Sequence, residues 1–180
     1  LAATSALGPA SMQILLPALP VIKETFEVST EVAQLTLSLS MLAIALGTLF
    51  YGPLSDKYGR KHVMLLGLSI TLVGSVFCFV ASTIELLIVG RFIQAFGAAV
   101  GLVLARAIVR DVYGAQEAAR VIATLVMVMV VAPMLSPALG GELMLRLGWE
   151  SVFVVIAIAC ILISLLLFKN LPETLEEPVP

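Results

Sequence analysis

The chain has 180 residues, of which 61% are hydrophobic and only 12% are charged, and its net charge is −2. Soluble domains carry about 45–50% apolar and about 25% charged residues, so this composition excludes a water-soluble globule. The dispersed basic residues also exclude a nucleic-acid-binding surface. At about 20 apolar residues for each bilayer crossing, the length accommodates about six membrane-spanning helices. We therefore expect an all-α membrane protein built as a six-helix bundle.

The first two expected spans cover about residues 1–22 and 32–51. Pro9, Pro17 and Pro20 each remove a backbone hydrogen bond, which predicts that the first helix is kinked or locally unwound. The second span carries a set of residues that recur at helical spacing, namely Gln34, Ser38, Met41, Ala45 and Thr48. A stripe of this kind indicates a helix face that meets protein or water instead of lipid.

A charged decapeptide, residues 52–61, separates the second span from the third, and we expect a tight loop there. Gly52 would let the end of the second helix approach a neighbour closely, and Gly59 would permit a turn that other residues avoid. Asp56 lies four residues before Arg60, so the two side chains can pair. An exposed pair contributes only about 0–1 kcal/mol, so we expect it to act as a conformational latch. The alternative is a polar loop without a further role.

Four more spans are expected at about residues 63–81, 84–108, 121–139 and 150–168. The fourth contains Arg91 and, one turn later, Gln94, with Arg91 about 10 Å from the outer end of the helix. Ionisable groups inside a membrane usually face a cavity, although an arginine at this depth can also extend its head to the interface. Nothing resembles a zinc, phosphate-binding or hydrolase motif, so no enzyme and no metal site are predicted.

Orientation is predicted from the lysines and arginines in the short loops. One side of the membrane receives most of them, namely Lys57, Arg60, Lys61, Arg110, Arg120 and Lys169. The other side receives Lys23 and Arg146. Because basic loops stay in the cytoplasm, we expect both ends of the chain to be cytoplasmic.

The decapeptide resembles the signature between helices two and three of the major facilitator superfamily, in the pattern Gly52-x-Leu54-x-Asp56-Lys57-x-Gly59-Arg60-Lys61. This resemblance implies a fold of 3+3 inverted repeats and a loop that stabilises one of two alternating-access states. It also implies that Asp111 pairs with Arg60, and that Asp56 faces a helix of the other half of the transporter. Arg91 and Gln94, followed by Gly97, resemble the fourth-helix motif of the same family.

Two further segments resemble the drug-efflux branch. Residues 15–20 resemble the first helix of the bicyclomycin and chloramphenicol resistance (Bcr/CflA) exporters, which usually carry an aspartate where Gln13 stands. Glutamine does not titrate near neutral pH, so Gln13 itself does not carry a proton. The fifth span resembles the antiporter motif, through Ala132, Ser136, Pro137, Gly140 and Gly141. Ordinary packing of small residues is the alternative for this segment.

The resemblance implies the amino-terminal half of an exporter in the bacterial inner membrane, driven by a proton gradient without a bound cofactor. Its cargo would be a small drug-like compound, and the residues expected along its path are Gln13, Arg91, Gln94, Gln34 and Ser38. Such proteins have twelve spans, so we expect a carboxyl-terminal six-helix half or a second copy as partner, with residues 171–180 opening the central linker. Two alternatives stay open: a metabolite exporter or importer on the same fold, and a non-transporting six-helix membrane partner or remnant.

Overall fold

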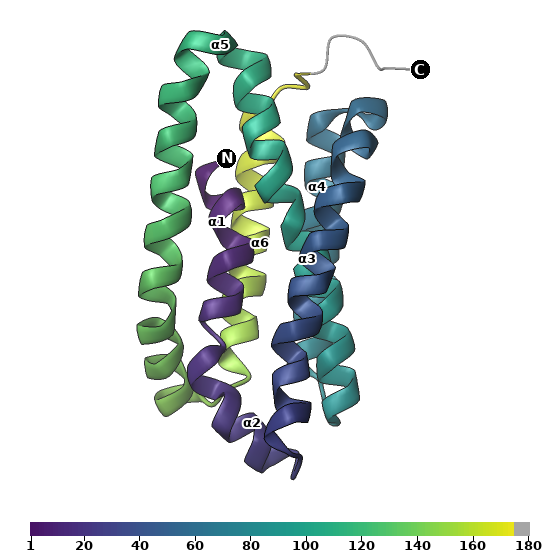
Figure 1. Ribbon diagram of the computed structural model, residues 1–180, viewed down its shortest axis with the longest axis vertical. Helices are drawn as coiled ribbons and strands as arrows, with labels where there is room; N and C mark the ends of the chain where they lie inside the picture. The colour runs from purple at the N-terminus through teal and green to yellow at the C-terminus, as the bar shows by residue number, and fades with distance from the viewer. Residues whose placement is uncertain (175–180) are drawn as a thin grey trace.

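The computed structural model describes residues 1–174, except the side chains of residues 114–116. Its helices are α1 (Ala2–Gln13), η1 (Leu16–Ala18), α2 (Leu19–Thr25), α3 (Thr30–Tyr58), α4 (Arg60–Phe79), α5 (Ile84–Leu147) and α6 (Ser151–Asn170). Helix α5 folds back on itself (Figure 1), and its two arms, Ile84–Tyr113 and Glu117–Leu147, are separate candidate spans. The described part of the chain therefore has six helical segments long and apolar enough to cross a membrane. This confirms the expected all-α, six-span bundle.

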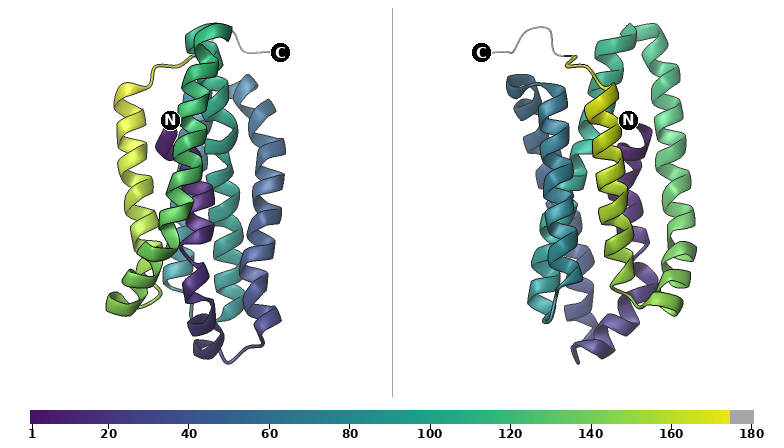
Figure 2. Two further views of the ribbon diagram at one scale, coloured as in Figure 1. Left: turned by 60° about the vertical axis from the view of Figure 1, so that its left-hand side comes forward. Right: turned by 180° about the vertical axis from the view of Figure 1, so that it is seen from behind.

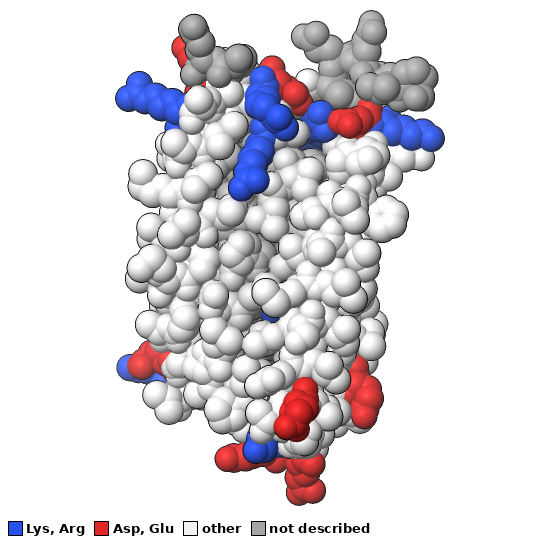
Figure 3. Space-filling view, in the orientation of Figure 1, with Lys and Arg blue, Asp and Glu red and all other residues white. Residues whose placement is uncertain are grey.

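The charged side chains of the bundle gather at its two ends, and the surface between them is almost uncharged (Figure 3). Large apolar side chains cover this middle belt: Leu49 is 72% exposed and Met134 is 73% exposed. In water such a surface would be strongly unfavourable, whereas in a bilayer it faces lipid tails of the same polarity. The chain is thus a multi-pass membrane protein.

The first span is interrupted, as its prolines predicted. Helix α1 ends at Gln13, and the chain continues through the short 3-10 helix η1 into α2. The interruption lies just before Pro17, whose ring lacks an N–H and clashes with the preceding turn. Pro9, by contrast, lies inside α1, which continues around it.

The expected loop at residues 52–61 is wrong except at one residue. Helix α3 continues to Tyr58 and α4 begins at Arg60, so Gly59 alone separates them. Gly59 has a φ of 92°, a conformation that residues with a Cβ rarely adopt, and this part of the prediction is confirmed. The end of an apolar run marks the edge of the bilayer, and the helix extends beyond that edge.

Close helix contact was predicted at the wrong glycine of α3. Among the described residues, a Cβ added at Gly52 would meet no atom within 4 Å, whereas one added at Gly47 would lie 2.7 Å from the Cβ of Ala99. Gly47 therefore provides the close approach between α3 and α5.

The first arm of α5 is the centre of the bundle. In the most apolar part of this arm 67% of the residues are buried, against 11% in the second arm, which stands at the periphery (Figure 1 and Figure 2). Glycines bring α4 against it: a Cβ added at Gly97 would meet the backbone N of Thr71 at 2.5 Å. Because α1, α3 and α4 all pack on this arm, its side chains are placed to connect them.

Candidate functional site

Arg60 connects three helices at the basic end of the bundle. Its Nη1 lies 2.6 Å from Oδ1 of Asp56 on α3, and its Nε donates to Oδ2 of Asp111 on α5 over 3.1 Å. The same Nη1 donates to the hydroxyl of Ser55 over 2.6 Å. The side chain of Arg60 is only 13% exposed, while that of Asp56 is 46% exposed. The expected contact between Arg60 and Asp111 is therefore present, and Asp56 keeps an accessible face.

Glu173, in the segment after α6, binds the start of α4. Its carboxylate accepts hydrogen bonds from the backbone N–H of Arg60 over 2.8 Å and of Lys61 over 3.2 Å, and it lies 3.2 Å from Nδ1 of His62. A carboxylate is stabilised there by the unpaired N–H groups of the helix terminus. A Cβ on Gly59 would lie 2.6 Å from Oε2 of Glu173, whose flexible side chain could shift, so the φ of 92° is what requires glycine here.

Two further residues of this motif, Lys61 and Leu54, contact other parts of the bundle. The Nζ of Lys61 donates to the backbone oxygen of Phe168 on α6 over 3.0 Å. Leu54 is half-buried and packs against the main core. The motif therefore joins α3 and α4 to α5 through Arg60 and to α6 through Lys61.

Arg91 and Gln94 lie inside the bundle, 1% and 0% exposed. Nη1 of Arg91 donates to Oε1 of Gln94 over 2.5 Å and to the backbone oxygen of Ser11 on α1 over 3.3 Å. Nε2 of Gln94 in turn donates to the hydroxyl of Ser75 on α4 over 2.8 Å. Nε and Nη2 of Arg91 find no partner among the described residues. The head of Arg91 thus connects helices in the interior and does not extend to the membrane surface.

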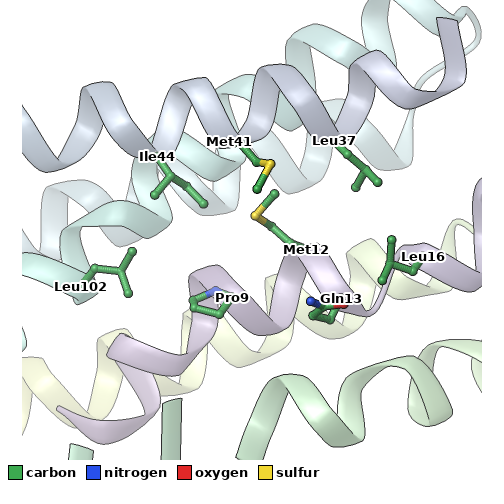
Figure 4. Close-up of a pocket in the computed structure, with 8 residues that line it drawn as sticks. All are labelled: Pro9, Met12, Gln13, Leu16, Leu37, Met41, Ile44 and Leu102. Atoms are coloured by element: carbon green, nitrogen blue, oxygen red, sulfur yellow. The ribbon is translucent and has the colours of Figure 1, made fainter. Parts of the chain in front are cut away.

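A cavity of about 430 Å³ lies between α1, α3 and the first arm of α5 (Figure 4). The side chains of Met12 and Met41 point toward one another across it. Gln13 is the one polar side chain among the residues that line it, which are Pro9, Met12, Gln13, Leu16, Leu37, Met41, Ile44 and Leu102. A chamber of this size is within the range that binds drug-sized molecules, about 300–1,000 Å³.

The residues predicted to lie along one path are found in different places. Gln13 lines the cavity of Figure 4, whereas Arg91 and Gln94 do not. Gln34 lines a smaller cavity of about 290 Å³ beside α2. Ser38 lies on the exposed face of α3, where its hydroxyl donates to the backbone oxygen of Gln34.

The antiporter-like residues lie on the second arm of α5. Gly140 faces the interruption of the first span, and a Cβ there would overlap the backbone oxygen of Ile14. Ser136 donates to the backbone oxygen of Ala132 over 2.7 Å, and Pro137 follows it inside the helix. A Cβ on Gly141 would meet no described atom within 4 Å, so of these two glycines Gly140 is the one that requires its small size for packing.

No group of three or more His, Cys, Asp or Glu side chains in the described part of the chain could hold a metal ion. Six membrane-length helices around a buried arginine and an apolar cavity place the chain in the class of multi-pass membrane proteins. The sequence profile of the Major Facilitator Superfamily matches residues 1–180. The chain belongs to this family, whose members here are transporters and not enzymes.

Two relatives illustrate the match. An uncharacterized MFS-type transporter of Bacillus subtilis, YdgK, is 36% identical over 97% of this chain and 44% of its own length. A bicyclomycin resistance protein homolog of Haemophilus influenzae is 34% identical over 94% of this chain and 43% of its own length. The chain thus spans less than half the length of these relatives.

The crystal structure of the peptide transporter POT in complex with alafosfalin has the same fold. It superposes with a TM-score of 0.81 over 98% of this chain and 38% of that chain, at 15% sequence identity. At this identity the likeness concerns the fold alone.

Proposed function

We propose that this chain forms the amino-terminal half of a proton-coupled transporter that exports small drug-like compounds by alternating access. Membership of the family and the bicyclomycin resistance homolog support this proposal. The observation that carries it is the position of Arg60, which joins α3, α4 and α5 at one end while Asp56 stays 46% exposed. Helices joined in this way move as one body, and an accessible carboxylate at their end can contact a partner half in one of two states.

The cavity of Figure 4 is the proposed cargo site. Methionines such as Met12 and Met41 are flexible and polarizable, so their side chains adapt to apolar molecules of different shape. Gln13 adds one donor and one acceptor group to an otherwise apolar wall, which would orient a cargo molecule without requiring one exact structure. These properties fit a transporter of several small compounds.

Proton coupling needs a titrating group, and Gln13 is not one. The described carboxylates lie near the two ends of the bundle (Figure 3). The candidates at the acidic end are Glu85, in the first turn of α5, and Glu142. The Oε1 of Glu142 accepts a hydrogen bond from Nε of Arg146 over 2.5 Å. We propose that any proton taken up by this half binds near an end and not at the position of Gln13.

The proposed location is the bacterial inner membrane, with both ends of the chain in the cytoplasm. Most lysines and arginines lie at one end of the bundle, where α6 ends and α4 begins, and basic loops stay on the cytoplasmic side (Figure 3). The proposed partner is a carboxyl-terminal six-helix half or a second copy, since the relatives are more than twice as long as the matched region.

Transport by inverted membrane vesicles containing the complete protein tests the proposal. With a proton gradient, vesicles should accumulate chloramphenicol, and collapse of the gradient should abolish the accumulation. Asp56→Asn should slow it about tenfold, a change of about 1.4 kcal/mol in the barrier, at an unchanged amount of protein in the membrane. Lys57→Gln is the matched control, because it changes a neighbouring exposed charge that makes no ion pair among the described residues. Equal transport by the wild type and the Asp56→Asn variant would contradict the proposed role.

A further inference from the structure

A second cavity, of about 460 Å³, lies between α3 and the two arms of α5. Its lining residues are Thr48, Leu102, Val103, Arg106, Arg110 and Met129. Leu102 also lines the cavity of Figure 4, so the two adjoin. On α3 they are one turn apart as well, with Ile44 in the first and Thr48 in the second. We call the two cavities together the amphipathic groove.

Two arginines make one end of the amphipathic groove basic. Leu102, Arg106 and Arg110 are spaced by four residues, which places them on one face of the first arm of α5. Arg106 lies seven residues before Tyr113, about 10 Å along the helix axis at 1.5 Å per residue. Basic side chains extend from the upper end of the molecule toward its uncharged middle (Figure 3).

Neither arginine has an anionic partner in the part of the chain that the structure describes. Within the described residues Arg106 and Arg110 form no ion pair, and the one polar contact of Arg106 is between Nη2 and the sulfur of Met129, 4.0 Å away. Asp111, which follows Arg110 in the chain, is engaged by Arg60 instead. Both arginines are exposed in the groove. Two like charges one turn apart on a helix repel each other.

An anion with two oxygens would relieve this repulsion. Guanidinium groups bind carboxylates and phosphates through paired N–H donors, and the interaction is strong where water is partly excluded. Beyond Leu102 the wall becomes apolar, up to Met12 and Met41. We infer that the amphipathic groove binds a molecule with an anionic oxygen group on Arg106 and Arg110 and an apolar body in the cavity of Figure 4.

Two sources supply this chemistry. One is an amphipathic organic anion carried as cargo, and this assignment rests on the proposed function. The other is an anionic phospholipid, because basic pockets between helices on the cytoplasmic side also hold lipid headgroups. Binding itself depends on neither assignment and is measured separately from transport.

Binding to the complete protein in phosphatidylcholine nanodiscs is measured with two probes, a dansyl-labelled undecanoate and its methyl ester. The wild type should bind the carboxylate about tenfold tighter than the ester, an advantage of about 1.4 kcal/mol. Arg106→Gln combined with Arg110→Gln should reduce this ratio to near one and leave ester binding unchanged. The corresponding double change to lysine should retain part of the preference, because it keeps both charges.

Arg120→Gln is the matched control, since Arg120 is exposed at the same end on the second arm and does not line the groove. It should bind both probes like the wild type. Equal affinity of the wild type for carboxylate and ester would overturn the inference, as would a preference that survives in the double glutamine variant. Loss of both probes in that variant would also overturn it, because the arginines would then support the fold and not the anion.

Two further experiments distinguish a bound lipid from a cargo molecule. If phosphatidylglycerol in the nanodiscs displaces the labelled carboxylate, the occupant is a lipid. If it does not, and inverted vesicles accumulate the carboxylate with a proton gradient, the occupant is cargo. A carboxylate that is neither displaced nor accumulated would overturn both sources. Chloramphenicol uptake by the same vesicles reports on the proposed function independently.

Discussion

Arg91 and Arg106 lie on the same arm of α5, 15 residues apart in the chain and about 22 Å apart along the helix axis. Their surroundings are opposite. Arg91 is 1% exposed and donates to Gln94 and to the backbone oxygen of Ser11. Arg106 is exposed in a cavity and contacts only the sulfur of Met129 among the described residues. Two arginines of one helix arm therefore differ in both burial and hydrogen-bond partners.

The packing of the neighbouring helices explains the difference. Near Arg91, α4 lies so close to α5 that a Cβ on Gly74 would overlap the backbone of Gln94. Near Arg106, α3 and the second arm of α5 diverge and leave the cavity of about 460 Å³. Tight packing encloses Arg91 within the bundle, and open packing leaves Arg106 accessible in a cavity.

Replacing the buried Arg91 is the strongest test of the contrast between Arg91 and Arg106. Arg91→Ala leaves a cavity and an unpaired amide at Gln94, so we expect a loss of about 2–4 kcal/mol in the free energy of unfolding. Transport should fall as well. A thiol-reactive dye can report thermal unfolding, because Cys78 and Cys160 are both buried in the folded chain. Arg106→Ala is the control, and an equal loss in both variants would remove the distinction.

Arg60 is intermediate in exposure between Arg91 and Arg106, so it tests whether burial determines the loss of stability. It is 13% exposed and has two carboxylates and one hydroxyl as partners. We expect Arg60→Gln to cost about 1–2 kcal/mol of stability, because hydrogen bonds to charged groups are strong and partial exposure weakens them. The same unfolding assay measures it. A loss as large as that of Arg91→Ala would show that burial does not determine how much free energy of unfolding is lost.

Ser75 is connected to Arg91 through Gln94, which hydrogen-bonds to both. Its hydroxyl accepts from Nε2 of Gln94, and Ser75 is 1% exposed. Ser75→Ala should therefore cost about 1 kcal/mol, the net value of one buried hydrogen bond. Thr48→Val, next to Arg106 in the open cavity, should cost less than about 0.5 kcal/mol. Equal effects in the unfolding assay would contradict the idea that only the Arg91 side is tightly connected.

The smallest effect on stability is expected at the groove itself. Arg106→Gln should change the free energy of unfolding by less than about 0.5 kcal/mol, because Arg106 is exposed and forms no ion pair among the described residues. Its visible effect should be on anion binding. A large loss of stability, measured with the same dye, would indicate that Arg106 supports the fold.

The sequence predicted the number of spans well, because the length of each apolar run is set by the thickness of the bilayer. It did not predict where helices end: residues 52–58 were expected in a loop and are helical, with Pro53 inside α3. The contact of Arg60 with Asp111 followed from the family resemblance. The gating role of the motif stays a prediction.

Contacts between distant segments were beyond sequence reasoning. Glu173 binds the start of α4 from 113 residues away, and no local pattern announces such a contact. Arg106 was visible only as a charge in an apolar run, because its cavity depends on how α3 and the second arm of α5 are placed. Arg91 and Gln94 are buried in the bundle, and their place along the cargo path stays a prediction.

Accessibility of the cavity from the two sides of the membrane tests alternating access most directly. In the complete protein without other cysteines, Met41→Cys places one thiol in the cavity of Figure 4. A membrane-impermeant maleimide should label it from both sides, since the two states interconvert. Adding Asp56→Asn should raise labelling from the cytoplasm and lower it from outside, because the closed cytoplasmic end loses a contact. Labelling from one side only, unchanged by Asp56→Asn, would contradict the account.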